Sequence, residues 1–472
     1  MNRPLTLVSS VAGAVVVALD GTVLTVAQPT LQRDLGASFA QVQWTTTGYL
    51  VAVAALLVFA GRLGDRYGHR RLYGLGMLGF GAASAAIAAA QDIGWVIGLR
   101  VVQGVFGALL QPATLGMLRA AYPPDRLRAP LAVRTAAIGV AAAAGPVLGG
   151  ALVTELGWRA VFLLHVVPAF AFGALALATR TPEPPRTAVR LDLPGALLLA
   201  LALAALVHGL AASTGAVPAL AVAAVAGAAF VRHERRTASP LLPADVVRSA
   251  AVGPALGVLV TASAALHGTL FLSVYLLQGA LGLDPFETAL RSLPLAVLMI
   301  TAAAVSPVLL RRSGARRTIT AATALLAAGI TLLSAASGTL ALCCGFALAG
   351  AGFGTVMVAA THVVVRHAAV ESAGAAGGLQ QTALNIGPAL GVATATLLTT
   401  SGSLRFPLLA LAALAATGSL IALALPPRPG ATGEAGGTKE VDEADGAVRS
   451  GEAGGGSGGS GGSGGVPSVE VR

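Results

Sequence analysis

Apolar stretches rich in Leu, Ala, Val and Gly recur along most of the chain, separated by short polar segments. Each stretch has the roughly 20 residues that an α-helix needs to cross the hydrocarbon core of a bilayer. The pattern predicts an all-α membrane protein with fourteen transmembrane helices. We expect these helices near residues 6–27, 43–60, 72–90, 94–117, 132–153, 159–178, 193–212, 216–231, 250–277, 289–309, 318–336, 339–362, 375–400 and 405–425.

The composition excludes most soluble classes. Of the 472 residues, 55% are hydrophobic and 11% are charged, and the mean hydropathy is +0.80. A soluble domain carries about 25% charged residues. A soluble enzyme, a secreted domain built on disulfides and a disordered regulator are therefore ruled out. The first apolar stretch lacks a convincing cleavage site, so we interpret it as a membrane span rather than a signal peptide.

The net charge of +10 comes from arginine clusters between alternate apolar stretches. These clusters follow the second, fourth, sixth, eighth and tenth predicted spans, whereas the opposite loops hold few arginines. Because arginine-rich loops stay in the cytoplasm, both termini are predicted to be cytoplasmic. The distribution indicates a multi-pass protein oriented in the cell membrane and argues against nucleic-acid binding.

Five short motifs occur twice, in the same order and at a near-constant spacing. The clearest is ALDGTV at 18–23, which recurs as ALHGTL at 265–270; another is GPVLG at 145–149, which recurs as GPALG at 387–391. Motifs that repeat in this way predict two six-helix halves in the same orientation, related by an axis along the membrane normal.

The repeat also predicts the domain boundaries. The N-terminal half covers residues 1–180 and the C-terminal half covers 249–426, with two extra transmembrane helices in a linker at 181–248. From 427 to 472 the apolar pattern stops, and the Gly-rich composition predicts a disordered cytoplasmic tail. Its Gly-Ser repeat is consistent with a native tail or with an added linker.

Two charged residues lie more than a few residues inside predicted spans. Asp20 is the only ionisable residue of the first span, and Arg100 lies well inside the fourth. A carboxylate at membrane depth is costly and by default functional, so Asp20 is predicted to carry the proton, with Arg100 tuning its proton affinity. The alternatives are a permanently protonated acid that bonds a neighbouring helix and a purely structural Arg clamp.

His267 occupies the position in the second half that Asp20 occupies in the first. If the halves are related by an axis along the membrane normal, His267 should face the central cavity opposite Asp20. The alternative is a structural hydrogen-bond donor. The polar residues that we expect to line the substrate cavity are Thr22, Gln28, Gln103, His267, Gln278 and Asn385.

Two glycine-rich motifs are candidates for gating and coupling. One lies between the second and third spans, where glycine spacing predicts a tight turn and a latch between conformations; an alternative is a solvated ion pair of little energetic value. The other lies in the fifth span, where Pro and Gly predict a kink or a sliding interface, or plain close packing. The residues are Gly61, Asp65, Arg66, Gly68 and Arg70 in the first motif, and Gly145, Pro146, Gly149 and Gly150 in the second.

The sequence contains no P-loop, HExxH, nucleophile elbow or Cys/His metal spacing. It therefore predicts no cofactor and no metal site, and it predicts that the protein is not an enzyme. A proton gradient is the expected source of energy.

At these motifs the sequence resembles the major facilitator superfamily, and within it the fourteen-spanner drug:proton antiporter family, over about residues 5–425. ALDGTVLTVAQPTLQRDLG is similar to the first-span motif of that family, GRLGDRYGHRR to the superfamily loop motif, RVVQGVFGA to the fourth-span motif and GPVLGG to the antiporter motif of the fifth span. The resemblance implies gating roles for Asp65 and Arg66 and a role in proton transfer for Arg100. GWRAVFLLHVVP is similar to a sixth-span motif, with His165 at a position that is usually Asn.

The resemblance implies proton-coupled export of small amphipathic molecules, such as antibiotics or secondary metabolites, by a functional monomer. The last six predicted spans contain no acid, unlike family members that take dicationic drugs, so we expect monocationic, neutral or weakly acidic substrates. Two rival functions stay open on the sequence alone: uptake by proton symport on the same fold, and a membrane enzyme or scaffold without transport.

Overall fold

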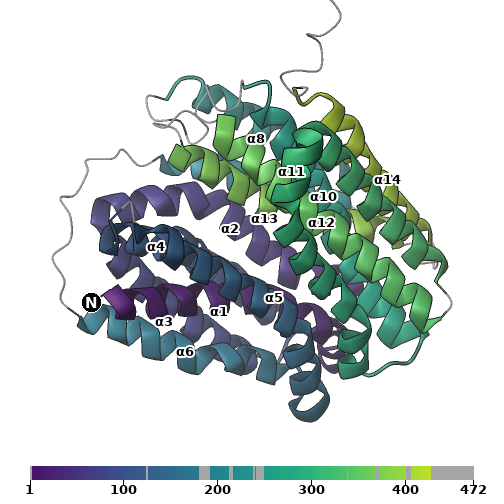
Figure 1. Cartoon of the computed structure of the whole chain (residues 1–472). Helices are drawn as coiled ribbons and strands as arrows, with labels where there is room; N and C mark the ends of the chain where they lie inside the picture. The colour runs from purple at the N-terminus through teal and green to yellow at the C-terminus, as the bar shows by residue number, and fades with distance from the viewer. Residues whose placement is uncertain are drawn as a thin grey trace, which may run out of the picture. The chain divides into compact units, whose positions relative to one another are not determined.

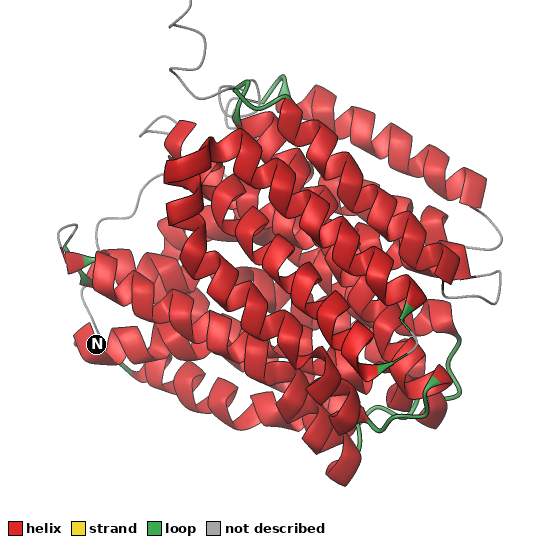
Figure 2. Ribbon diagram, turned by 45° about the vertical axis from the view of Figure 1, so that its right-hand side comes forward, coloured by secondary structure: helices red, strands yellow, loops and turns green. Residues whose placement is uncertain are grey.

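The computed structural model describes residues 3–123, 126–179, 192–211, 216–237, 240, 249–336, 338–367, 373–399 and 405–426. Within these residues the chain forms long α-helices and one π-helical turn, and no strand (Figure 2). The elements are α1 (Arg3–Asp34), α2 (Phe39–Tyr67), α3 (His69–Ala88), α4 (Ile93–Ala121), α5 (Arg128–Leu156), α6 (Arg159–Ala178), α7 (Leu193–Ala211), α8 (Ala216–Glu234), α10 (Val252–Tyr275), η2 (Leu276–Ala280), α11 (Pro285–Ala335), α12 (Thr339–His367), α13 (Ala373–Leu398) and α14 (Arg405–Leu423).

Eleven of these helices are long and apolar enough to cross a membrane. The criterion uses only length and apolar composition, and α3 and α13 do not meet it. Large apolar side chains point away from the protein: Val167, Val217 and Leu340 are 75%, 79% and 78% exposed. A helix surface of this kind suits lipid rather than water, and it agrees with the prediction of a multi-pass membrane protein.

The helix α11 covers two predicted spans. Asp284 caps its start by accepting a hydrogen bond from the backbone N–H of Glu287, and Pro285 occupies its first turn. Within the 51 residues Gly314 has φ 75°, a left-handed conformation that interrupts the helical backbone. The predicted spans at 289–309 and 318–336 lie on the two sides of this glycine.

The helices α1–α6 pack among themselves, and so do α10–α14 (Figure 1). In the first group α1 packs on α5, α2 on α4, and α3 on α4 and α6. In the second group α10 packs on α13, and α11 on α12 and α14. Each pairing of the first group thus has a counterpart in the second, as two copies of one six-helix unit require.

Glycines of the repeated Gly-Pro motif make close contacts between equivalent pairs of helices in the two groups. A Cβ added to Gly149 of α5 would lie 2.9 Å from the carbonyl oxygen of Val23 in α1. Gly391 of α13 approaches the backbone of Ala264 in α10 in the same way. Because only glycine permits so close an approach, the motif sets the helix spacing in both halves.

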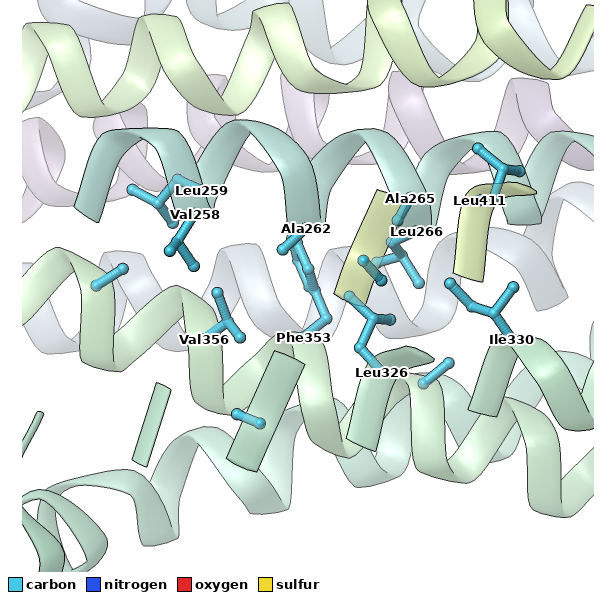
Figure 3. Close-up of a cluster of buried hydrophobic side chains, with 14 of the residues drawn as sticks. Val258, Leu259, Ala262, Ala265, Leu266, Leu326, Ile330, Phe353, Val356 and Leu411 are labelled. Atoms are coloured by element: carbon cyan, nitrogen blue, oxygen red, sulfur yellow. The ribbon is translucent and has the colours of Figure 1, made fainter. Parts of the chain in front are cut away.

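Buried aliphatic and aromatic side chains form the largest core, in the second half. Figure 3 shows part of it, with residues of α10 facing Leu326 and Ile330 of α11, Phe353 and Val356 of α12, and Leu411 of α14. The interdigitated side chains fix these four helices relative to one another.

The helices α7 and α8 pack on each other, and α7 also contacts both α2 and α13. Leu203 and Val207 of α7 are buried with Val51 of α2 and Ala389 of α13. The inserted pair therefore touches both halves through α7. The predicted boundaries at 181 and 248 and the predicted tail at 427–472 lie outside the described residues.

Candidate functional site

Asp20 and Arg100 form a buried ion pair between α1 and α4. Arg100 Nη1 donates to both carboxylate oxygens of Asp20, at 2.9 Å to Oδ1 and 2.8 Å to Oδ2. Each side chain is 1% exposed. The charge of the acid is thus balanced by one guanidinium, and both side chains are buried.

Neighbouring helices complete the polar cluster around the pair. Gln103 donates to Asp20 Oδ1 at 3.3 Å and to the Ser84 hydroxyl on α3 at 2.8 Å, and its own oxygen accepts from Arg100. Arg100 Nε donates to the Thr45 carbonyl on α2 at 2.8 Å. The guanidinium also lies over the ring of Tyr49, 4.4 Å from its centroid, in a cation–π contact. Four helices of the first half therefore meet in this cluster.

The energetics of such a pair depend on both partners being present. The desolvation cost of two buried charges largely cancels their attraction, so the pair itself adds little stability. Removing one partner leaves an uncompensated buried charge, which costs about 3–5 kcal/mol. The cluster is consequently sensitive to the protonation state of Asp20.

A cavity of about 500 Å³ lies next to this cluster, between the two halves. It is lined by residues of α1, α2, α4 and α5 on one side and of α10, α11, α12 and α13 on the other. This volume falls in the range of sites for drug-sized molecules, about 300–1,000 Å³. Of the six residues expected from the sequence, Thr22, Gln28, His267 and Asn385 line it.

Gln103 and Gln278 lie elsewhere, which corrects the expectation for these two residues. Gln103 is fully buried, and both ends of its amide are hydrogen-bonded inside the Asp20 cluster. Gln278 lies in η2, where its amide donates to the Val26 carbonyl of α1 at 3.0 Å. Its role in this structure is a contact between the halves.

His267 and Asp20 differ in their surroundings although their sequence positions are equivalent. His267 lines the cavity, donates from Nδ1 to the Ser263 carbonyl at 2.9 Å and meets Phe353 edge-on at 6.2 Å. Asp20 is instead turned into the first half toward Arg100, and it is Arg100 that lines the cavity.

One end of the cavity is closed by contacts between the halves. The Gln278–Val26 bond joins η2 to α1, and Phe39 of α2 packs edge-on against Phe271 and Tyr275 of α10, at 4.9 and 4.7 Å between ring centroids. These contacts lie where α1 ends and α2 begins, far along the chain from the N-terminal end of α1.

The fifth-span motif contributes to the same closure. A Cβ on Gly150 of α5 would lie 2.7 Å from the Pro285 carbonyl oxygen at the start of α11. Gly145 approaches Thr22 of α1, and Pro146 lines the cavity. The motif therefore sets two close helix contacts, one within the first half and one between the halves.

The motif at 61–70 is more helical than predicted. Because α2 continues to Tyr67, Gly61, Asp65 and Arg66 lie in its last turns, and only Gly68, with φ 96°, makes the turn into α3. His69 Nε2 donates to Asp65 Oδ1 at 3.1 Å.

The basic residues of this motif join α2 and α3 to their surroundings. Arg66 lies 5.4 Å from the centroid of the Tyr67 ring, and Arg70 donates to the carbonyls of Ala176 and Thr179 at the end of α6. The latter contact ties α3 to α6 within the first half.

Two functional candidates did not stand out in the sequence. Arg134 falls near the start of the predicted span at 132–153 and was not singled out; in the structure it lies inside α5 and lines the cavity. His165 of α6 is 1% exposed, meets Phe80 edge-on at 5.9 Å, and neither ring nitrogen has a hydrogen-bond partner among the described residues. The signal that could have revealed Arg134 is a charged residue inside the apolar stretch predicted at 132–153.

The family model of the Major Facilitator Superfamily matches residues 11–382 and 258–455 of the chain. The chain belongs to this superfamily. It is 38% identical over 409 residues to the tetracenomycin C resistance and export protein of Streptomyces glaucescens, covering 84% of this chain and 76% of that protein. It is 36% identical to the puromycin resistance protein pur8 of Streptomyces alboniger, covering 84% and 82%.

A further superfamily relative is the multidrug efflux pump LfrA of Mycolicibacterium smegmatis, 31% identical, covering 80% of this chain and 77% of that protein. Among solved structures, a mutant of the peptide transporter POT in complex with sulfate matches with a TM-score of 0.66 at 18% identity, covering 90% of this chain and 94% of the other. This likeness agrees with the two-half helical fold described above.

Proposed function

We propose that the chain is a proton-coupled exporter of small amphipathic molecules, such as antibiotics or secondary metabolites. We further propose that it crosses the cell membrane fourteen times, has both termini in the cytoplasm and works as a monomer. Support for export comes from the relatives, whose names describe resistance, export and efflux. The observation that carries proton coupling is the buried Asp20–Arg100 pair beside the cavity.

Asp20 is proposed to bind the transported proton. When Asp20 is charged, it holds Arg100 and, through Gln103, Ser84. A proton on Asp20 removes the charge that balances Arg100, so the guanidinium must find other partners or meet water. Because the cluster joins α1, α2, α3 and α4, this change in one residue alters the contacts of four helices.

The closed end of the cavity is proposed to face the outside of the cell. The arginine-rich loops predict that the N-terminus of α1 is cytoplasmic, and the closing contacts lie at the opposite end of that helix. The structure then corresponds to an inward-facing state, in which substrate enters from the cytoplasm or the inner leaflet. Opening the outer end exposes the site to the exterior, where substrate leaves and a proton binds.

Expression in a drug-sensitive bacterium tests the direction of transport. A panel that includes tetracenomycin C and puromycin is compared between cells with the wild-type chain, Asp20→Asn or an empty vector. An exporter raises the inhibitory concentration and lowers the cellular content of at least one compound, and Asp20→Asn abolishes both effects. Higher cellular content with the wild-type chain would instead support uptake by symport and contradict export.

A further inference from the structure

The charges that line the cavity are unbalanced. The ionisable residues among its lining are Tyr49, Arg100, Arg134 and His267, and no carboxylate lies among the lining residues that the structure describes. Arg100 is already matched by Asp20. The remaining fixed positive charge that faces the cavity is Arg134.

Within the described part of the chain, Arg134 is held in place by a hydrogen bond to a neutral group. Its Nη2 donates to the Thr114 hydroxyl at 2.9 Å, and its Nε has no partner among the described residues. Thr114 is itself fixed, because its hydroxyl donates to the Gln111 carbonyl at 2.9 Å and its carbonyl accepts from Ser10 at 2.8 Å. The guanidinium is thus oriented before any ligand binds, which reduces the entropy cost of binding.

We propose that the Arg134 end of the cavity binds the acidic group of an organic anion, a carboxylate or phenolate carried on an aromatic body. A guanidinium binds a carboxylate through charge-assisted, often bidentate hydrogen bonds, and an anion supplies the counter-charge that the site lacks. The rest of the ligand lies along the apolar wall, which includes the partly exposed Ile138, Leu270 and Met357. The proposal rests on the proposed function only in taking this cavity as the substrate site.

The repeat-related residue strengthens the same preference. His267 lines the cavity with its Nδ1 already donating to a backbone carbonyl, so the position equivalent to Asp20 carries no negative charge that could pair with a cation. A cationic ligand in this cavity meets the unbalanced charge of Arg134 and finds no carboxylate to pair with it among the described lining residues. Charge repulsion therefore selects against cations while Arg134 selects for anions.

Equilibrium binding of three fluorescent probes of similar shape tests the proposal. The probes are anthracene-2-carboxylate, anthracene-2-carboxamide and anthracen-2-ylmethylammonium, titrated into purified full-length protein without a proton gradient. We expect the carboxylate to bind the wild-type protein about tenfold or more tightly than the amide, and the ammonium to bind weakest. Tightest binding of the ammonium, or equal binding of all three, would overturn the proposal.

Variants then locate the anion site. Arg134→Gln should weaken binding of the carboxylate probe about tenfold or more and leave binding of the amide probe unchanged. Arg134→Lys should keep part of the preference for the carboxylate. Arg317→Gln, an exposed site outside the cavity with the same loss of charge, is the matched control. A carboxylate preference that survives Arg134→Gln overturns the assignment. Because binding needs no gradient, anion preference with no export contradicts the exporter proposal alone, and export without anion preference contradicts this one alone.

Discussion

At the scale of residues, the site depends on a balance of charges inside the membrane. The sequence identified Asp20 and Arg100 separately, because charged residues are rare within apolar stretches. It could not show that they touch, since 80 positions separate them and only the packing of α1 on α4 brings them together. For the same reason Gln103 was predicted to line the cavity, whereas its amide is hydrogen-bonded to Asp20 and Arg100.

Asp20→Asn and Arg100→Leu are each expected to lower the stability of the purified protein. Either change leaves one member of a buried ion pair without its counter-charge, at a cost of about 3–5 kcal/mol. The double variant should lose less stability than the sum of the losses of the two single variants, because no unpaired charge remains. Melting temperatures in detergent measure this cycle, and additive losses would show that the two residues do not interact.

Gln103→Leu and His165→Leu form a second, contrasting pair of variants. Gln103→Leu removes hydrogen bonds to Ser84 and Asp20 and should destabilise the protein by about 1–3 kcal/mol. His165→Leu should be close to neutral, because neither ring nitrogen has a partner among the described residues and an apolar side chain suits its buried place. The same melting assay compares them, and a larger loss for His165→Leu would reveal a bonding role for the imidazole.

At the scale of elements, the apolar pattern located helices well and helix ends poorly. Every predicted span coincides with a helical segment. In lipid, a continuous stretch of about 20 apolar residues satisfies the hydrogen bonds of its own backbone by forming a helix. The ends differ because helices continue beyond the hydrocarbon into polar residues. The helix α2 runs through Gly61 and Asp65 to Tyr67, so the expected turn is helical. The helix α5 begins at Arg128, a few residues before the predicted span at 132–153, so Arg134 lies well inside the helix and in the cavity wall.

The contact between α5 and α11 predicts a strong effect of side-chain size at Gly150. A Val there collides with the backbone of Pro285 and Phe286 and should favour states in which this end is open. Gly139→Val in the same helix is the matched control, because nothing lies within 4 Å of a Cβ at that position. Spin-label distances between α5 and α11 measure the change. Equal distance distributions in the two variants would show that the contact at Gly150 does not keep this end closed.

At the scale of the whole molecule, the internal repeat accounts for the paired packing of helices in the two halves. It does not account for the different use of equivalent positions, since Asp20 pairs within its own half while His267 faces the cavity. That difference depends on Arg100, which has no basic counterpart among the matched motifs of the second half. The inserted helix α7 touches α2 and α13, so it must adjust whenever the halves move relative to each other.

Gln278→Leu is expected to weaken the closed end of the cavity. The variant removes the hydrogen bond to the Val26 carbonyl, which is worth about 0.5–1.5 kcal/mol, or a shift of about two- to tenfold in the open population. In a background with Ser at Cys343 and Cys344, a membrane-impermeant maleimide added outside the cell reports on Thr22→Cys in the cavity. Labelling should rise in the presence of Gln278→Leu, and unchanged labelling would show that this bond does not hold the outer end shut.

The movement of protons on addition of substrate tests the central claim of proton-coupled export most directly. Everted membrane vesicles are energised to an acidic interior, and the panel compound with the largest resistance effect is added while the internal pH is followed by a fluorescent dye. Wild-type vesicles should accumulate the compound and lose protons, in proportion to each other, and Asp20→Asn vesicles should do neither. Accumulation that proceeds without proton release, or proton release that is undiminished in Asp20→Asn, would contradict the account.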